Sequence, residues 1–550
     1  MSIQLFAAIS RKSITNDEVV HIPAGYYHLV AGDFQLNNEH PPLVKMWAAL
    51  SLLFVQPNEP NIAADSEANF SARTWGFHQE FWFANRARFQ AVSYWPRVMM
   101  VPITLMLGLI IFLFTRRLFG ATAALIAVAL FTLEPNLLAH GRIVHTDVPS
   151  TLAFLLFFYA LFNYSHQSSW RNAILLALAT SVALLTKFSM VILVPVLCCY
   201  AIGRFWMLRS NRAERTTLIK QALATIFIII LAINMAYYFQ RPPLSSSDQK
   251  WLRSNSPSAA ETIDKGIRAA SYVVPPYFLF GIYNVVVHNR GGHAASLLGT
   301  YGNNGWWYYF PVAFALKTTL PFLMLSVAAV LWALWSLFAR SDRRFLWLLI
   351  PLAIYTLVSL TGHINIGIRH FLPAFPFLII LGAAFLSRFI QERSRVVGVA
   401  LVTIIFGWML VEVVRTFPNY TPYMNQLASA KPHWMYLSDS NVEWGDDVLS
   451  LVNYLKVRGE TSVRGALSGG WSTLPEYGID YISLAPPASP TKDTKYVAIG
   501  ASFLNGSTVP NFERNGRVLT DEERVNLFDS YRHRVPEAIF GGSIYLYREH

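Results

Sequence analysis

Long apolar segments, separated by short polar ones, fill the first three quarters of the chain. A helix needs roughly 20 apolar residues to cross the hydrocarbon core of a bilayer, and ten segments come close to that length. The pattern predicts an all-α polytopic membrane protein with about ten to eleven transmembrane helices. The segments lie near residues 97–115, 121–139, 148–164, 172–186, 190–207, 218–239, 307–338, 345–361, 371–388 and 396–414.

The segments before the first of these spans have a different character. The first ten residues, MSIQLFAAIS, are apolar but too short to span a bilayer, and they lack the pattern of a signal peptide. We expect them to be the last turns of a transmembrane helix that starts further upstream. Residues 40–55 and 76–95 mix aromatic, apolar and charged residues at helical spacing. This mixture predicts helices that lie along the membrane surface.

The last quarter of the chain changes period several times. Residues 446–459 are helix-like, whereas residues 495–503 and 542–548 are strand-like. This alternation predicts a small α/β domain. The expected organisation is a transmembrane module at residues 1–414, with outer loops at 11–96 and 240–306, followed by a C-terminal domain at 415–550.

The distribution of lysine and arginine orients the predicted helices. Clusters of these residues fall in alternate connections, and the short cytoplasmic loops of membrane proteins carry this excess. The other connections and the C-terminal domain are therefore expected on the extracytoplasmic side of the cell (inner) membrane. The net charge of +12 then needs no nucleic-acid partner. The clusters are Arg116/Arg117, Arg204 to Arg215, Arg340 to Arg344 and Arg388 to Arg395.

Ionisable residues gather in the connections predicted to face outward. Charges at membrane depth are costly and commonly functional, although many loop charges are only solvated. A carboxylate can take the proton from a hydroxyl group, and cations can neutralise a phosphate that is held or leaves. Acids and cations at one face therefore suit group transfer from a lipid phosphate. The candidates are Asp17, Glu18, His40, Lys45, Arg142, His145, Asp147, Lys187, Arg369 and His370.

Four segments resemble one superfamily of enzymes, the C-type glycosyltransferases. The run TNDEVVHIP (15–23), with HPPLVK (40–45) after it, resembles their first outer loop, which has an acidic pair and a His-Pro-Pro-Leu-x-Lys segment. GRIVHTDVP (141–149), LLTKFS (184–189) and IRHFLPAFPFLI (368–379) resemble later parts of the same proteins. The chain is similar to bacterial phospholipid-carrier-dependent members, relatives of the protein O-mannosyltransferases of family 39 and of aminoarabinose transferase.

This resemblance implies an enzyme that transfers a sugar from a polyprenyl-phosphate donor to an acceptor hydroxyl on the extracytoplasmic face, with inversion. The implied partners are that lipid-linked sugar, membrane lipids, and a glycan, lipid or protein acceptor. Neither the sugar nor the acceptor is specified. In this assignment the catalytic residues are Asp17 (the base), Glu18 and Asp147, the ligands of the donor phosphate are Lys187, Arg369 and Arg142, and the substrate contacts are His40, Lys45 and His145.

Local sequence also offers plainer roles for these residues. The acidic pair follows Thr-Asn, and Asp147 precedes Val-Pro, so both could cap or begin helices. His40 stands before two prolines, which favour the first turn of a helix. Lys187 could extend to the membrane interface from a helix end, and Arg369 could anchor its helix there.

No metal or other cofactor is expected. His40 and His145 with the nearby acids could hold a divalent ion, but their spacing is not diagnostic. The segment SDSNVEWGDD (438–447) suits a hard cation, although a turn leading into a capped helix is the plainer interpretation. Cys198 and Cys199 are adjacent in an apolar run, which fits helix packing rather than a disulfide framework or a metal site.

Two other classes of protein are compatible with part of the pattern. A transporter or flippase could bind a lipid-linked sugar without transferring it, but transporters tend to have inverted repeats and sites near the bilayer midplane. This sequence shows no repeat, and its candidate charges lie at one predicted face. A receptor would leave the combination of acids and cations unexplained. The sequence therefore favours a membrane glycosyltransferase.

Overall fold

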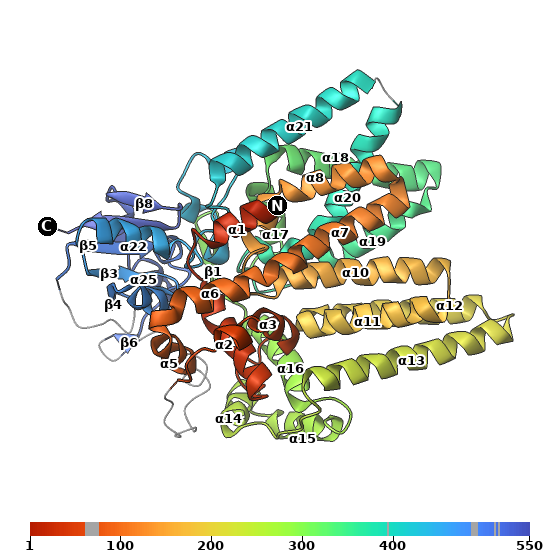
Figure 1. The fold of residues 1–550 in the computed structure, drawn as a ribbon, viewed down its shortest axis with the longest axis horizontal. Helices are drawn as coiled ribbons and strands as arrows, with labels where there is room; N and C mark the ends of the chain where they lie inside the picture. The colour runs from red at the N-terminus through yellow and green to blue at the C-terminus, as the bar shows by residue number, and fades with distance from the viewer. Residues whose placement is uncertain (61–75, 393–394, 486–492, 511–512, 515–516, 550) are drawn as a thin grey trace. The chain divides into compact units, whose positions relative to one another are not determined.

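The computed structural model describes residues 1–60, 76–392, 395–485, 493–510, 513–514 and 517–549, and Figure 1 shows the course of the chain. The chain forms two compact units. Unit 1 contains Met1–Val19, Trp82–Ile143 and His288–His550, and unit 2 contains Val20–Phe81 and Val144–Val287.

Eight helices of the described part are long and apolar enough to cross a membrane. Two more predicted spans correspond to shorter apolar helices, α8 (Ala121–Thr132) and α11 (Trp170–Thr186), of 12 and 17 residues. The prediction of a polytopic helical membrane protein is thereby confirmed. The eight candidates are Arg86–Phe119, Asp147–His166, Phe188–Met207, Arg212–Ala236, Leu320–Arg340, Arg343–Leu360, Ile368–Gln391 and Val396–Thr416.

Polar residues divide two of the predicted spans, which is a correction to their boundaries. Segment 121–139 forms α8 and then α9 (Pro135–His140), because the Glu134 carboxylate caps α9 by accepting a hydrogen bond from the Leu137 amide at 3.1 Å. Segment 307–338 forms α17 (Tyr309–Lys317) and α18 (Leu320–Arg340), separated by two threonines with extended backbone. Average hydropathy conceals such breaks.

Helix α20 (Phe375–Glu392) is the centre of the helical part of unit 1. It packs against α7 (Met100–Phe119), α8, α18, α19 (Leu346–Leu360) and α21 (Arg395–Thr416). Small residues allow this close packing: Gly382 of α20 lies against Leu325 of α18 and Leu130 of α8. The span that contains α20 is accordingly 89% buried, more than any other candidate span.

Unit 2 contains a second group of long helices, α10 to α13. Helix α11 packs against both α10 and α13, and these helices run side by side in Figure 1. The Tyr164 hydroxyl of α10 donates to Gln221 Oε1 of α13 at 2.6 Å. The two predicted surface segments are also helical. The bounds are α3 (Pro42–Ala49), α4 (Leu52–Val55), α5 (Phe77–Ala84), α10 (Asp147–His166), α12 (Leu193–Met207), α13 (Arg212–Ala236), α14 (Ser246–Asn255), α15 (Ala260–Ala270) and α16 (Pro276–Gly291), with α6 (Phe89–Val98) in unit 1.

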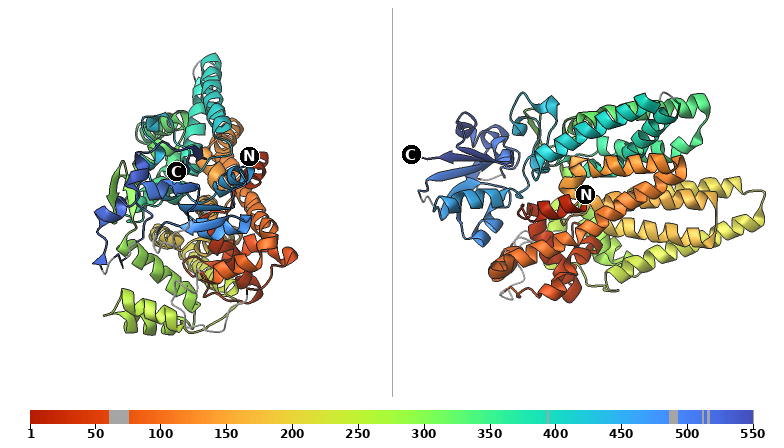
Figure 2. Two further views of the ribbon diagram at one scale, coloured as in Figure 1. Left: turned by 90° about the vertical axis from the view of Figure 1, so that its left-hand side faces the viewer. Right: turned by 45° about the horizontal axis from the view of Figure 1, so that its top comes forward.

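The end of the chain forms the predicted α/β fold, within unit 1. A five-stranded sheet has the order β4-β3-β5-β9-β8, in which β3 is parallel to both of its neighbours and β9 is antiparallel to both of its own. The right-hand view of Figure 2 shows these blue strands with helices against them. The strands are β3 (Ser462–Ala466), β4 (Asp480–Ser483), β5 (Tyr496–Gly500), β8 (Ala538–Phe540) and β9 (Ile544–Arg548).

The shorter elements complete the description. Helix α1 begins unit 1, whereas α2 starts in unit 1 and continues into unit 2. Strand β1 pairs with β2 in an antiparallel hairpin. Their bounds, with those of the short C-terminal elements, are α1 (Ser2–Ile9), α2 (Asn16–Val30), β1 (Ala295–Leu297), β2 (Thr300–Gly302), α23 (Gly470–Thr473), α24 (Ala501–Leu504), β6 (Glu513–Arg514), β7 (Arg517–Val518), α25 (Asp521–Val525) and α26 (Asp529–Arg532).

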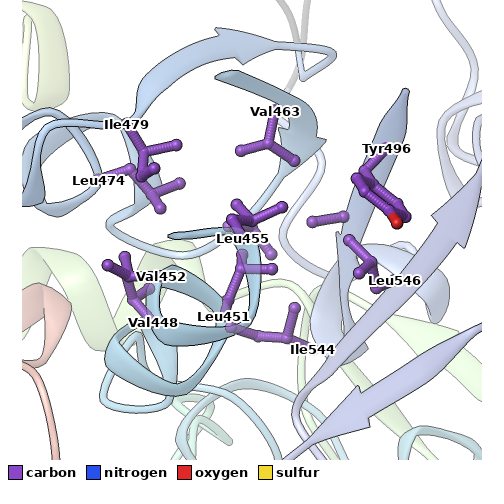
Figure 3. Packing of buried hydrophobic residues seen from close by; sticks show 12 residues of the cluster. Val448, Leu451, Val452, Leu455, Val463, Leu474, Ile479, Tyr496, Ile544 and Leu546 are labelled. Atoms are coloured by element: carbon purple, nitrogen blue, oxygen red, sulfur yellow. The ribbon is translucent and has the colours of Figure 1, made fainter. Parts of the chain in front are cut away.

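Helix α22 (Val448–Val457) supplies one side of the core of this domain. Val448, Leu451, Val452 and Leu455 are spaced i, i+3, i+4 and i+7, which places them on one face of the helix. All four are buried, and they gather with side chains of the sheet such as Val463, Ile544 and Leu546 (Figure 3). The predicted helix at 446–459 is confirmed, with its ends shortened.

We expect Leu451→Ala to destabilise the C-terminal domain by about 2–5 kcal/mol, because it removes buried methyl groups and leaves a cavity. The measurement is thermal unfolding of the purified protein in detergent. Val457→Ala is the control on the same helix, since Val457 is 83% exposed. Equal effects of the two substitutions would contradict the described packing.

Candidate active site

The acidic pair at the start of α2 separates into two environments. The Thr15 amide donates to Glu18 Oε2 at 2.7 Å, and the Glu18 amide donates to Thr15 Oγ1 at 3.3 Å. This reciprocal pair is a capping box, which satisfies two backbone donors at the helix start. The Glu18 side chain is fully buried, with Arg97 Nε 3.5 Å from its Oε1. The capping alternative from the sequence is therefore confirmed for Glu18.

Asp17 lies at the surface of the same turn. Its side chain is 25% exposed, and its Oδ2 accepts a hydrogen bond from Arg369 Nη1 at 2.5 Å. Trp444 Nε1 lies 3.3 Å from Asp17 Oδ1 as a second donor. The Arg369 guanidinium also stacks over the Trp444 ring at 4.2 Å, an arrangement that favours a cation. We call these three residues the Asp17 cluster.

A second set of ion pairs is completely buried near the same segments. Arg142 Nη2 bonds Asp446 Oδ2 at 2.5 Å, and the Thr421 hydroxyl donates to the same carboxylate at 2.9 Å. Lys12 pairs with Asp447. Burial opposes ionisation of Asp446, but Lys12 and Arg142 outweigh it and lower the pKa of Asp446. Burial and the neighbouring Asp446 together raise the pKa of Asp447.

The structure corrects the plainer interpretation of segment 438–447. Asp447 does precede α22, but its carboxylate bonds to Lys12 and to the Ser543 hydroxyl instead of capping that helix. Trp444 and Asp446 were not among the predicted site residues. The sequence does show a tryptophan among four acidic residues in this segment. It does not identify the distant lysine and arginine residues with which the segment interacts.

Unit 2 holds the remaining predicted residues in a cluster of its own, the Asp147 cluster. Asp147 pairs with Lys187, and His145 Nδ1 lies 3.0 Å from Asp147 Oδ2. Helix α10 begins at Asp147, with Thr146 in the cap position, so Asp147 is a residue of the first turn rather than the cap. Lys187 is buried and bonded to Asp147, which does not support its extending to the membrane interface.

His40 and Lys45 lie close together in the same unit. The His40 ring meets the His21 ring edge-on, with centroids 5.4 Å apart. Burial, His21 and the ammonium groups of Lys187 and Lys45 lower the pKa of His40 well below its ordinary value. Lys45 Nζ donates to the His40 carbonyl at 3.0 Å and to Asn37 O and Oδ1 at 2.6 and 3.2 Å. These contacts use all three lysine donors and hold the loop against α3.

Burial lowers the pKa of Lys45 from 10.5 to about 7, partly opposed by Glu39. Between these two pH values the unfolded chain binds more protons than the folded protein, so the contribution of Lys45 makes stability rise with pH. We expect wild type to gain thermal stability relative to Lys45→Met between pH 7.5 and 9.5. The comparison is made by thermal unfolding in one detergent. A constant difference across this range would contradict the lowered pKa of Lys45.

The predicted metal alternatives gain no support from the described residues. No three histidine, cysteine, aspartate or glutamate side chains in this part of the chain are grouped to hold a metal ion. Cys198 and Cys199 are exposed on α12, so the expectation that they pack inside the helical unit is wrong.

The fold places this chain among the polytopic helical membrane proteins, and its acidic side chains form ion pairs with lysine and arginine. Residues 89–237 match the family described as dolichyl-phosphate-mannose-protein mannosyltransferase. The predicted resemblance to the protein O-mannosyltransferases is thereby confirmed over these residues. The matched segment contains Arg142, His145, Asp147 and Lys187. A search of curated protein sequences found no match.

Solved structures of two kinds of protein resemble the fold. ArnT from Cupriavidus metallidurans bound to undecaprenyl phosphate is 13% identical, with 94% of this chain and 95% of that chain covered and a TM-score of 0.47. The apo form of an Archaeoglobus fulgidus oligosaccharyltransferase is 14% identical, with 82% and 57% covered and a TM-score of 0.41.

Proposed function

We propose that this protein is a membrane glycosyltransferase that moves a sugar from a polyprenyl-phosphate donor to an acceptor hydroxyl on the extracytoplasmic face, with inversion. The observation that carries the proposal is the Asp17 cluster, in which a partly exposed carboxylate bonds directly to Arg369. The family match over residues 89–237 adds independent support for sugar transfer.

Asp17 would act as the base. It would take the proton of the acceptor hydroxyl while that oxygen forms a bond to the anomeric carbon of the donor sugar. The bond from that carbon to the phosphate oxygen breaks, and its electron pair leaves with polyprenyl phosphate. Glu18 is buried in the helix cap, so the base assignment falls on Asp17 rather than on its neighbour.

Arg369 would hold the donor phosphate and also regulate the base. A guanidinium bonded to Asp17 stabilises the charged carboxylate and makes it a weaker base. A phosphate that binds Arg369 competes with Asp17 for the same N–H groups. Donor binding would therefore release Asp17 for the acceptor proton. Trp444 keeps the guanidinium in place by stacking under it.

Unit 2 holds a further predicted phosphate ligand, Lys187. Within that unit, Asp147 bonds to the Lys187 ammonium and holds it in position. In the same unit, His40, His145 and Lys45 would contact the substrate. Arg142 is fully buried against Asp446 in unit 1, so the proposal gives it a structural role instead of a contact with the phosphate. Because protein cations would neutralise the leaving group, the proposal includes no metal, and transfer should persist in EDTA.

The test uses purified protein in liposomes with polyprenyl-phosphate mannose, glucose and a pentose as donors and an envelope lipid extract as acceptor. Acceptor-dependent release of polyprenyl phosphate from any donor is the expected result. The rival function is lipid transport, which would move a fluorescent lipid-linked sugar between leaflets and leave its phosphate bond intact. No release from the whole panel would count against the enzyme.

A further inference from the structure

Residues 440–447, which we call the strap, contact both segments that carry the Asp17 cluster. The Asn16 amide donates to the Trp444 carbonyl and the Ser13 amide to the Asp446 carbonyl, each at 2.9 Å. The Ile368 amide, next to Arg369, donates to Asn441 Oδ1 at 2.9 Å. The strap is therefore bonded to the backbone beside Asp17 and to the backbone beside Arg369.

The other side of the strap is fixed to the C-terminal sheet through Glu443. Its carboxylate accepts hydrogen bonds from the Ser468 amide at 2.8 Å and from the Ser502 amide at 2.9 Å. Ser468 follows the end of β3, and Ser502 follows the end of the neighbouring strand β5. Glu443 is buried, and burial raises the pKa of its carboxyl group from 4.5 to about 7, although the two amide donors act to lower it.

The sheet topology makes this position significant. Strands β3 and β5 are neighbours in the sheet. The chain continues from β3 to β4, which lies on the far side of β3, whereas β9 is hydrogen-bonded to the far side of β5. Open α/β sheets bind their ligands at the carboxyl ends of two such strands, where the strand order reverses. In this protein a carboxylate of its own chain occupies that position. The C-terminal domain thus uses its ligand-binding edge to hold the strap.

Two glycines fit the strap to the sheet. A Cβ on Gly500 would lie 2.0 Å from Glu443 Oε1, so a side chain there would displace the carboxylate. Gly445 has a φ of +94° and approaches the sheet loop so closely that a Cβ would lie 2.8 Å from the Ser468 carbonyl oxygen. Only glycine adopts such a conformation without strain. The strap is therefore held against the sheet both by the Glu443 side chain and by its backbone at Gly445.

We propose that Glu443 is a positioning residue of the transferase and that the C-terminal domain, through the strap, places Asp17 and Arg369 for the reaction. The effect on catalysis rests on the proposed function, whereas the structural role of the strap does not depend on it. Trp444 transmits the position, because its indole donates to Asp17 and its ring supports Arg369.

Hydrogen exchange tests the structural part without any substrate. We expect amide exchange in segments 13–17 and 366–369 to be at least about tenfold faster in Glu443→Gln and Glu443→Ala than in wild type. Glu537→Gln is the matched control. Glu537 belongs to the same domain and accepts from two tyrosine hydroxyls, at 2.7 and 3.3 Å, away from the strap. Unchanged exchange in both Glu443 variants would overturn the proposal.

The catalytic part is tested by kinetics per folded molecule. We expect Glu443→Gln to lower kcat at least about tenfold with donor KM within about twofold, and Glu537→Gln to do neither. Trp444→Phe keeps a ring under Arg369 but removes the donor to Asp17, so the acid limb of its pH profile should move to higher pH. A purely structural role would lower the folded yield and leave kcat and the pH profile unchanged, and that result would overturn the positioning role.

The two proposals fail in different ways. If wild type releases no polyprenyl phosphate while Glu443→Gln still speeds amide exchange in segment 13–17, the proposed function is wrong and the structural role of the strap is supported. If wild type is active and the Glu443 variants match it in amide exchange, kcat and pH profile, the positioning role of the strap is wrong and the proposed function is supported.

Discussion

Asp17→Asn is expected to reduce the rate of sugar transfer by about 10²–10⁴-fold, the usual contribution of a general base. Arg369 and Trp444 donate to different oxygens of Asp17, so the single oxygen of the amide can keep one of the two hydrogen bonds. The fold and the donor KM should therefore change little. The measurement is the initial rate of polyprenyl phosphate release, with the thermal midpoint recorded for the same preparation. A variant that transfers at the wild-type rate would show that another group is the base.

Glu18→Gln should lower the stability of the protein more than its rate of sugar transfer. The Glu18 carboxylate is buried in the capping box and lies beside Arg97. Glutamine can still serve in a capping box, but it leaves the buried Arg97 without a carboxylate beside it, which is costly. The thermal midpoint should therefore fall more than in Asp17→Asn while the rate falls less. The opposite order in both measurements would contradict the separation of the two acids.

Arg142→Met is expected to lower the free energy of unfolding by about 3–5 kcal/mol, because it leaves Asp446 as a buried charge without its guanidinium. Lys12, which also acts on Asp446, should keep the loss near the lower end. The measurement is thermal unfolding in detergent. The double variant Arg142→Met/Asp446→Asn should recover part of the loss, since the buried charge is then removed. A double variant less stable than the single one would contradict the ion-pair account.

Much of the fold could be predicted from apolar patterns. The long spans, the surface helix after His40 and the strands at 495–503 and 542–548 were each visible as runs with a clear period. The breaks at Glu134 and at Thr318 were not, because one capping carboxylate or one extended pair of residues hardly changes the average hydropathy of 20 residues. The exposure of the two cysteines on α12 was also missed, since an apolar run shows no period that separates an inner from an outer face.

The site could be predicted only in part. The acidic pair and the distant cations were found by residue type, sidedness and resemblance, and Asp17 does meet Arg369. Which acid of the pair faces outward depends on the capping box at Thr15, a local signal that was noted as an alternative. Trp444 meets Asp17 across 427 residues, and Glu443 meets Ser468 and Ser502 across 25 and 59 residues. No local pattern carries that information.

In the proposed reaction, Asp17 and Arg369 promote the transfer of a sugar from a lipid phosphate. The most direct test follows one labelled polyprenyl-phosphate sugar in a single turnover, with wild type and Asp17→Asn in matched liposomes. Wild type should form polyprenyl phosphate and glycosylated acceptor in equal amounts, with the anomeric configuration inverted, while Asp17→Asn binds the donor and forms neither. Equal product from both proteins, or retained configuration, would contradict the account.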